Sequence, residues 1–400
     1  MTGARDEAAK NGPLAGVRII DLTANMSGPY ATVILAEQGA DVIKVEPPGG
    51  EVIRRIGTGR DEMTAYFANL NRTKRSVVIE LKHPAAADVV RALVASADVV
   101  IQNYRHGVAE AMGFGPGALC AAFPKLVYLS ITGFGRTGPL SAQPAYDHVL
   151  QALSGMAARQ ADPRGGPPAL VRHGIVDKTT GLMASQAIVA GLLQRTRTGL
   201  GGPIEVSMLD AALHFLWPDG MVNNTCLDPV DVLPPVASGF RLNETADGYV
   251  AMITVTDAQW KGMLAALDRT AELDDPDLAT PRGRMKHGGN TMREVAAQLR
   301  QMPTAEVVSK LQAHDVPCSE VVSLDDLAAH PQVVASESLE EVVHPKLGRL
   351  VQPRPPAHFA GPEASRWPAP DPGEHTDAVL TELGMGNDEI ARLRADGVVA

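Results

Sequence analysis

The sequence predicts an α/β fold in which a parallel β-sheet is covered by helices on both faces. Through the first 210 residues, short apolar runs alternate with helix-like stretches. The runs have no polar face, so both sides of each strand must be buried, which is typical of parallel sheets. A Pro- and Asn-rich stretch at about 223–239 then separates these elements from a second unit.

The elements of the first unit follow from this alternation. Strands are expected at 17–22, 41–46, 76–81, 98–103, 126–131 and 203–207. Helices are expected at about 29–38, 84–96, 108–122, 178–195 and 208–216. Gly39 closes the first helix at the position where left-handed backbone favours glycine.

The rest of the chain predicts a second unit and a returning C-terminal segment. A strand at 247–253 begins the second unit, and helices are expected near 257–267 and 304–314. The segment from Pro345 to Pro372 is dense in proline and forms no compact unit by itself. We expect it to travel back across the first domain.

Composition and charge exclude several classes of protein. Of the 400 residues, 45% are hydrophobic and 20% are charged, which excludes a mostly disordered chain. The net charge of −10 and the 4% content of aromatic residues argue against a nucleic-acid-binding protein. The polar N-terminus lacks the apolar core of a signal peptide, and no apolar run of about 18 residues is present. We therefore expect a cytoplasmic protein with no nucleic-acid or membrane partner.

Sequence motifs for several chemistries are missing. The cysteines Cys120, Cys226 and Cys318 are far apart, and no histidines have the spacing of a zinc site, so no metal is expected. The first strand is not followed by a Gly-x-Gly-x-x-Gly dinucleotide loop. The chain also lacks a P-loop and a Gly-x-Ser-x-Gly nucleophile motif.

Three groups of cationic residues fall in the loops of the first domain. Arg72, Lys74 and Arg75 lie around the start of a predicted strand, whereas Arg105 and Arg136 follow the ends of two others. Ligands of open parallel sheets bind beyond the carboxyl ends of the strands. In an acidic protein, these groups favour a ligand with several phosphates over separate solvated patches.

Asp177 is the most informative acid. It stands at the predicted start of the long helix, where Asp is a favoured N-cap. In a second interpretation, the helix N-terminus keeps a buried carboxylate ionised and available as a nucleophile. The spacing of residues leaves both interpretations open.

Short motifs recur in a fixed order along nearly the whole chain. They lie at 14–22 (LAGVRIIDL), 28–32 (GPYAT), 39–50 (GADVIKVEPPGG), 71–76 (NRTKRS), 103–105 (NYR), 133–135 (GFG), 144–147 (PAYD) and 373–377 (GEHTD). Together they resemble the class III CoA-transferases, the family of formyl-CoA transferase, carnitine CoA-transferase and α-methylacyl-CoA racemase.

The resemblance implies a fold and a set of binding residues. A large Rossmann-like domain would hold CoA and a smaller α+β domain would follow, with divisions at 1–225, 226–330 and a return segment at 331–400. Two chains would interlock as a homodimer. The substrates would be an acyl-CoA and a carboxylic acid, with coenzyme A as the only cofactor. By position, the residues expected to contact CoA are Asn25, Met26, Lys44, Arg72, Lys74, Arg75, Asn103, Tyr104, Arg105, Lys125, Arg136 and Tyr146.

Asp177 matches the catalytic aspartate of the family by position. The resemblance implies that its carboxylate attacks the donor thioester to give a mixed anhydride and free CoA thiolate. The thiolate then forms an aspartyl-CoA thioester, which the acceptor acid resolves.

Two alternatives to a CoA-transferase stay open. The racemase branch moves a proton at the α carbon with a histidine that Tyr146 replaces here, while His148 lies two positions further on. A tyrosine with an ordinary pKa of about 10 is a poor base at neutral pH, which favours the transferase. The second alternative is a catalytically inactive acyl-CoA-binding protein.

Two departures from the family pattern leave the identity of the transferred acyl group open. Met26 replaces a Gln of the formyl-CoA enzyme, and Gly239 is a single glycine where many transferases have several.

Overall fold

The computed structural model describes residues 11–162 and 165–400, which divide into two compact units. The first unit contains the described residues up to Ala161, together with Pro167–Phe215 and Glu337–Ala400. The second unit is Leu216–Ser336 with the short stretch Asp162–Gly166. The chain therefore leaves the first unit near residue 216 and returns to it near residue 337. The divisions expected from the sequence were at residues 225 and 330.

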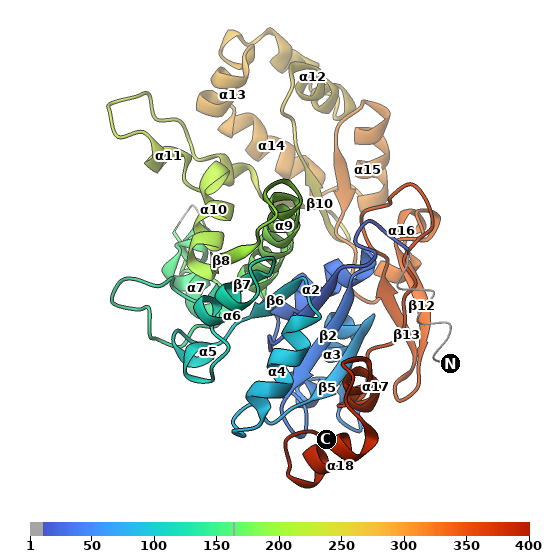
Figure 1. Cartoon of the computed structure of the whole chain (residues 1–400). Coiled ribbons are helices and arrows are strands. Elements are labelled where there is room, and N and C mark those ends of the chain that lie inside the picture. The colour runs from blue at the N-terminus through green and yellow to red at the C-terminus, as the bar shows by residue number, and fades with distance from the viewer. Residues whose placement is uncertain (1–10, 163–164) are drawn as a thin grey trace. The chain divides into compact units, whose positions relative to one another are not determined.

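A six-stranded sheet forms the centre of the first unit (Figure 1). Its order is β5-β2-β1-β6-β7-β8, and every neighbouring pair is parallel, so the predicted parallel sheet is confirmed. The strands are β1 (Arg18–Asp21), β2 (Asp41–Glu46), β5 (Lys74–Val78), β6 (Val99–Gln102), β7 (Val127–Thr132) and β8 (Gly202–Ser207). The order of strands along the chain reverses between β1 and β6, and ligands of such sheets bind where the loops diverge.

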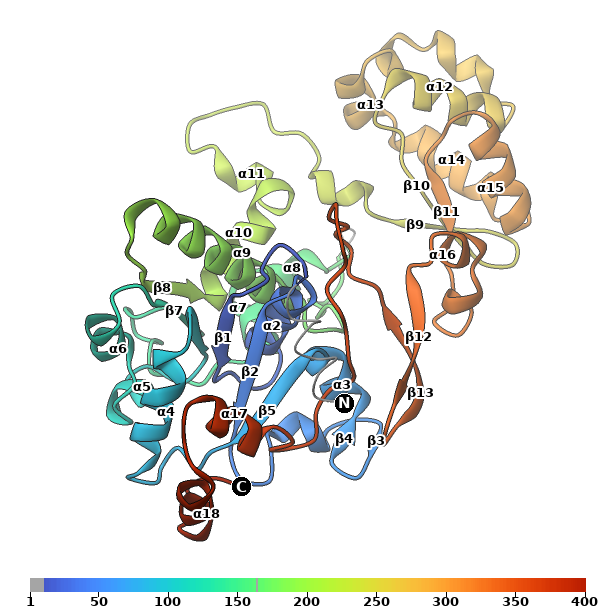
Figure 2. The same ribbon diagram turned by 45° about the vertical axis from the view of Figure 1, so that its right-hand side comes forward.

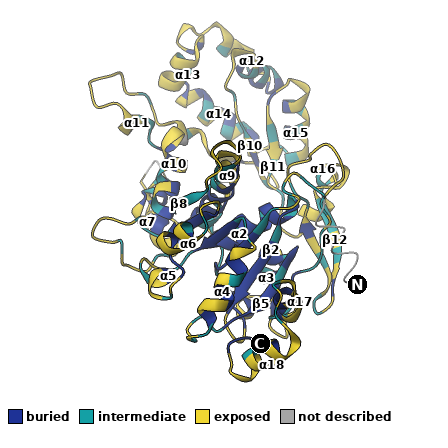
Figure 3. Cartoon of the chain, in the orientation of Figure 1, coloured by how far each residue is buried: buried dark blue, intermediate teal, exposed yellow. Residues whose placement is uncertain are grey.

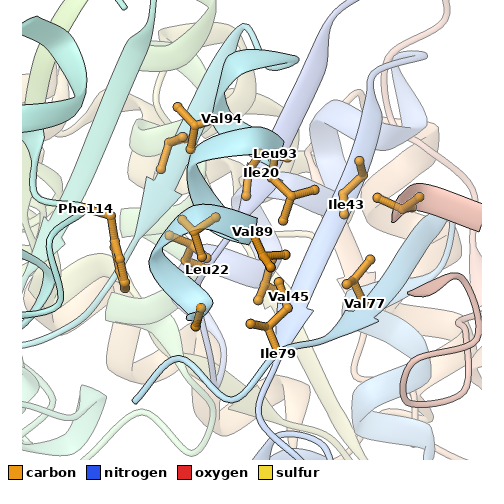
Figure 4. Close-up of a cluster of buried hydrophobic side chains, with 14 of the residues drawn as sticks. Ile20, Leu22, Ile43, Val45, Val77, Ile79, Val89, Leu93, Val94 and Phe114 are labelled. Atoms are coloured by element: carbon orange, nitrogen blue, oxygen red, sulfur yellow. The ribbon is translucent and has the colours of Figure 1, made fainter. Parts of the chain in front are cut away.

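Helices bury both faces of this sheet. One face is covered by α2 (Ser27–Glu37), α7 (Asp147–Leu153), α8 (Met156–Arg159), α9 (Ile175–Thr198) and α10 (Met208–Gly220). The other is covered by α4 (Ala86–Ala95), α5 (Val108–Ala111), α6 (Pro116–Ala122), α17 (Thr376–Glu382) and α18 (Asn387–Ala395). The strands other than the edge strand β8 are mostly buried, while the outer faces of the helices are exposed (Figure 3). Figure 4 shows Val89 and Leu93 of α4 packed against Ile20, Ile43 and Val45 of the sheet.

Several boundaries differ from the sequence prediction. The helix expected at 108–122 is two short helices, because Gly113 takes left-handed backbone (φ +84°) and Phe114 turns into the core. The strand expected at 76–81 begins at Lys74 and ends at Val78, because its first residues pair with Val42 and Ile43 of β2. The long helix begins before residue 178, at Ile175.

The C-terminal segment returns to the first unit, as predicted. It begins with the hairpin of β12 (Leu339–His344) and β13 (Gly348–Pro353), and ends with α17, which lies beside β5, and then α18 (Figure 2). The N–H of His375 donates to the carbonyl oxygen of Ser76 at 2.9 Å, and Val399 forms a bridge with Ile79. The edge of the sheet is thus completed by residues far away in the sequence.

Four short elements lie between β2 and β5 in the chain. They are η1 (Val52–Arg55), β3 (Gly59–Arg60), β4 (Met63–Thr64) and α3 (Ala65–Asn71).

The second unit combines a small antiparallel sheet with helices. The sheet has the order β11-β10-β9, from β9 (Leu242–Glu244), β10 (Tyr249–Met252) and β11 (Cys318–Glu320). A separate core, which includes Trp260, Val295 and Leu311, lies under its helices. The helices are α11 (Val222–Thr225), η2 (Val236–Gly239), α12 (Asp257–Ala266), η3 (Thr270–Asp274), η4 (Pro276–Leu278), α13 (Pro281–His287), α14 (Gly289–Leu299), α15 (Thr304–Ala313), η5 (Leu327–Ala329) and α16 (Pro331–Ala335).

Two features are absent from the part of the chain that the structure describes. No helix within 11–162 or 165–400 is long and apolar enough to cross a membrane. The same residues contain no group of three or more His, Cys, Asp or Glu side chains that could hold a metal ion.

Candidate active site

The loop between β1 and α2 is held by a side chain from the neighbouring strand. Asn103, directly after β6, accepts a hydrogen bond from the N–H of Ala24 at 3.0 Å and donates to its carbonyl oxygen at 2.8 Å. These two bonds join the β1–α2 loop to the residue that follows β6, and the strand order reverses between β1 and β6. The loop leads into α2, which begins at Ser27. The start of α2 therefore lies at the expected ligand-binding edge of the sheet.

Asp177 lies in the first turn of α9 and faces the start of α2. The N-cap of α9 is Gly174, so the expectation that Asp177 caps this helix is wrong. Ser27, the first residue of α2, instead lies close enough for its N–H and hydroxyl group to lower the pKa of the Asp177 carboxyl by hydrogen bonding. The carboxylate is held near the N-termini of two helices, where the partial positive charge of each favours an anion.

Two glycines allow α2 and α9 to approach this closely. A Cβ atom at Gly181 would lie 2.7 Å from the carbonyl oxygen of Ser27. A Cβ atom at Gly174 would lie 2.6 Å from the Sδ atom of Met26. Side-chain carbons do not reach such distances, so a larger residue at Gly181 would push the backbone of Ser27 away from α9, whereas at Gly174 it would displace the flexible end of the Met26 side chain.

A buried carboxylate fixes the start of α9. Asp147, the first residue of α7, accepts a hydrogen bond from the N–H of Asp177 at 2.9 Å and another from Nε2 of Gln151 at 2.6 Å. Gln151 is fully buried, and its side-chain oxygen accepts from the N–H of Val171 at 2.9 Å. Asp147 and Gln151 thus anchor the segment that leads into α9.

Burial and a neighbouring charge control the ionisation of Asp177. Burial, and after it the Asp147 carboxylate, raise the pKa of its carboxyl to about 6, against the lowering effect of Ser27 and His148. Tyr66, on α3, is half-buried nearby. Its pKa is raised to about 12 by burial and by the carboxylates of Asp177, Glu51 and Asp147, so the phenol stays protonated at neutral pH.

This arrangement suits nucleophilic chemistry at a carboxylate. With a pKa of about 6, Asp177 is mostly ionised at pH 7, and its partial burial removes the water that would otherwise solvate the charge. A desolvated carboxylate close to hydrogen-bond donors can attack an acyl carbon and form a covalent intermediate.

The cations expected to contact CoA are mostly engaged inside the first unit. Lys44 and Lys74 are fully buried, and they pair with Glu51 at 2.7 Å and with Asp21 at 3.1 Å. Arg72 pairs with Glu37 at 2.6 Å. Arg75, near the start of β5, pairs at 2.6 Å with both Asp41 and Glu382. These four residues contribute to internal ion pairs, which sequence spacing does not reveal.

The other expected contacts divide between the two edges of the sheet. Arg105 and Arg136 are exposed and follow β6 and β7, so they lie at the carboxyl edge, as does the exposed Tyr146 before α7. Tyr104 follows β6 too, and its ring packs edge-on against Phe114. Lys125 precedes β7 and lies at the opposite edge.

Asn25 and Met26 lie in the β1–α2 loop itself. The N–H of Asn25 donates to the Glu51 carboxylate at 2.8 Å, and its φ is +66°. The half-buried side chain of Met26 reaches Gly174. Sequence reasoning gave no role to Ser27, Asp147, Gln151 and Glu51. Asp147 lies in a quoted motif, and Ser27 and Glu51 each lie directly beside one, whereas nothing in the sequence marks Gln151.

Known proteins resemble the whole chain. Residues 14–376 match the sequence profile described as CoA-transferase family III. Succinyl-CoA:glutarate CoA-transferase of Mus musculus is 31% identical, over 97% of this chain and 90% of that protein. Formyl-CoA:oxalate CoA-transferase of Streptomyces coelicolor is 30% identical, over 96% of this chain and 99% of that protein.

The fold agrees with this similarity. A crystal structure from Mycobacterium tuberculosis superposes with a TM-score of 0.80 at 30% identity, covering 92% of this chain and 99% of that one. A CAIB/BAIF family protein from Brucella suis gives a TM-score of 0.77 at 28% identity, covering 93% of this chain and all of that one, 100%. The chain therefore belongs to CoA-transferase family III, and it is an enzyme of the CoA-transferase class.

Proposed function

We propose that the enzyme transfers CoA from an acyl-CoA thioester to a carboxylic acid through covalent intermediates on Asp177. The observation that carries this proposal is the position of the Asp177 carboxylate, partly buried at the start of α9 and facing the Ser27 donors. The arrangement supports a nucleophile, because the carboxylate is ionised at neutral pH yet poorly solvated.

The reaction balances without an added cofactor. A carboxylate oxygen of Asp177 attacks the thioester carbonyl carbon; the C–S bond breaks, giving an acyl-aspartyl anhydride and CoA thiolate. The thiolate attacks the aspartyl carbonyl carbon and expels the donor carboxylate, leaving an aspartyl-CoA thioester. The acceptor carboxylate then repeats both steps in reverse, which yields the new acyl-CoA and restores Asp177.

Neighbouring groups take distinct parts in this scheme. Asp147 holds the N–H of Asp177 and so fixes the direction of approach of the carboxylate. The N–H and hydroxyl of Ser27 orient the nucleophile before attack and lie close to the oxyanion that forms on the acyl carbon. CoA would lie along the carboxyl edge of the sheet, with its phosphates near Arg105 and Arg136.

We also propose that two chains form a homodimer, as the family resemblance implies.

Trapping of the covalent intermediate tests the proposal. The enzyme is incubated with formyl-CoA or succinyl-CoA, treated with borohydride, digested and analysed by mass spectrometry. A reduced Asp177, or CoA attached to it, is the expected result, and Asp177→Asn should give neither while still binding CoA. CoA binding with an unmodified Asp177 under both donors would contradict the mechanism and would favour a catalytically inactive binding protein.

One observation favours the racemase as a second candidate function. The charge of His148 reaches Asp177 closely enough to lower the pKa of the carboxyl, so a histidine base and an acid are near one another. In a racemase, one group removes the α proton of a 2-methylacyl-CoA and another returns a proton on the opposite face. Deuterium uptake at that carbon in heavy water, lost in His148→Ala, would establish this alternative over the transferase.

A further inference from the structure

A buried ion pair next to the β1–α2 loop has no part in the chemistry proposed above. The Lys44 ammonium lies 2.7 Å from Oε1 of Glu51, and the two side chains are 0% and 4% exposed. Removing two charges from water costs about as much free energy as their attraction returns, so such a pair adds little net stability. Its contacts point to another purpose.

Both members of the pair hold the backbone that leads to Ser27. Lys44 Nζ donates to the carbonyl oxygen of Thr23 at 2.9 Å. Oε2 of Glu51 accepts from the N–H of Asn25 at 2.8 Å. The pair therefore binds the two peptide groups that flank Ala24, while Asn103 binds Ala24 itself. Three side chains from outside the loop thus determine the path of three consecutive residues.

The loop turns at a residue with left-handed backbone. Asn25 has a φ of +66°, a conformation that asparagine adopts more readily than most residues other than glycine. The hydrogen bond from its N–H to Glu51 holds the turn at this residue. Only Met26 separates Asn25 from Ser27, so a change in the backbone at Asn25 would move the Ser27 donors.

We infer that Lys44 and Glu51 are positioning residues, which hold the β1–α2 loop so that the N–H and hydroxyl of Ser27 face the Asp177 carboxylate. The consequence for catalysis rests on the proposed function of Asp177, whereas the consequence for its ionisation does not. Asp177 interacts electrostatically with Asp147, Ser27, His148 and Tyr66, whereas Glu51 contacts Lys44 and the N–H of Asn25.

Two substitutions of Glu51 separate its contacts. Glu51→Ala removes both the partner of Lys44 and the acceptor for Asn25. Glu51→Gln removes the charge, but its amide oxygen still accepts from the N–H of Asn25. The matched control is Glu37→Gln, which breaks another pair, with Arg72 at 2.6 Å, at the far end of α2; those side chains are 6% and 11% exposed.

Two measurements on each variant test the inference. The first is the single-turnover rate of Asp177 labelling by formyl-CoA or succinyl-CoA. The second is the pH midpoint for modification of Asp177 by a water-soluble carbodiimide, which reacts with the protonated carboxyl and needs no turnover. Loss of the Ser27 donors disfavours the ionised form, so in Glu51→Ala we expect labelling about tenfold slower and a midpoint about one pH unit higher. Glu51→Gln should lie between Glu51→Ala and the wild type, and Glu37→Gln should match the wild type.

The outcomes distinguish this inference from the proposed function. A wild-type rate and midpoint in Glu51→Ala would overturn the positioning role. If Glu51→Ala does not fold, Glu51→Gln decides, and values equal to those of Glu37→Gln overturn the inference. A raised midpoint in a protein whose Asp177 no donor labels would support the positioning role and refute the nucleophile.

Discussion

Replacing Asp147 by Asn should shift the acidic limb of the pH dependence of Asp177 labelling to lower pH. The Asp147 carboxylate is the second cause, after burial, of the rise in the pKa of Asp177 from 3.8 to about 6. Removing this charge should lower the pKa by about one unit, or about 1.4 kcal/mol. At pH 6 the ionised fraction of Asp177 would then rise from about one half to about nine tenths.

The structure also predicts a cost of the same substitution. Both oxygens of Asp147 accept hydrogen bonds, from the N–H of Asp177 and from Gln151, and an Asn side chain can accept only one of them. We therefore expect Asp147→Asn to lose about 1–2 kcal/mol of unfolding free energy and to label more slowly at pH 8.

The assay is the single-turnover rate of Asp177 labelling by an acyl-CoA donor across the acidic limb. Asp88→Asn is the charge-matched control, because Asp88 is exposed in the first turn of α4 on the opposite face of the sheet. Asp88→Asn should leave the limb in place. An unmoved or raised midpoint in Asp147→Asn would refute the electrostatic reasoning.

Three further predictions concern stability and helix packing. Asp177→Asn should raise the unfolding free energy at pH 7.5 by up to about 3 kcal/mol and change it little at pH 3.5. The reason is that the carboxyl ionises above about pH 3.8 in the unfolded chain but only above about pH 6 in the folded one. Denaturant titration at both pH values checks this, and an equal effect at both would contradict it. Gly181→Ala should cost about 1–3 kcal/mol and slow labelling, because its Cβ meets the Ser27 carbonyl oxygen, whereas Gly191→Ala meets only methyl groups and should label normally. Buried lysines and hydroxyl donors lower the pKa of Asp21 in the folded protein to about 2. Its contribution of about 2 kcal/mol to the free energy of unfolding is therefore complete above about pH 4 and is lost as the pH falls through 2. Asp21→Asn should remove this pH dependence from acid-unfolding curves.

Most of the first unit could be predicted from the pattern of apolar residues. The run at 41–46 is a strand with the predicted bounds, because its residues are buried on both faces and the pattern needs no tertiary information. The predicted ends of helices and strands were wrong where the local sequence pattern was weak. Nothing in the sequence showed that Lys74 and Arg75 pair with β2 and extend β5 toward its start.

The candidate site was less predictable than the fold. Asp177 was singled out, but its residue spacing left an N-cap and a nucleophile equally open, because a helix start is identified to within a few residues only. Its shift to the third helical position decides its chemistry, since the side chain then faces Ser27 and not its own backbone.

The sequence by itself determined the alternation of strands and helices, the return of the C-terminal segment and the family likeness, because each depends on residue types at short spacing. Only the tertiary structure decided which charges are buried. Lys44 and Lys74 are cations in the sequence, like Arg105 and Arg136, but the first two are buried against acids that lie 7 and 53 residues away, at Glu51 and Asp21. Pairing of charges depends on distance in space, and the order of residues along the chain does not contain it.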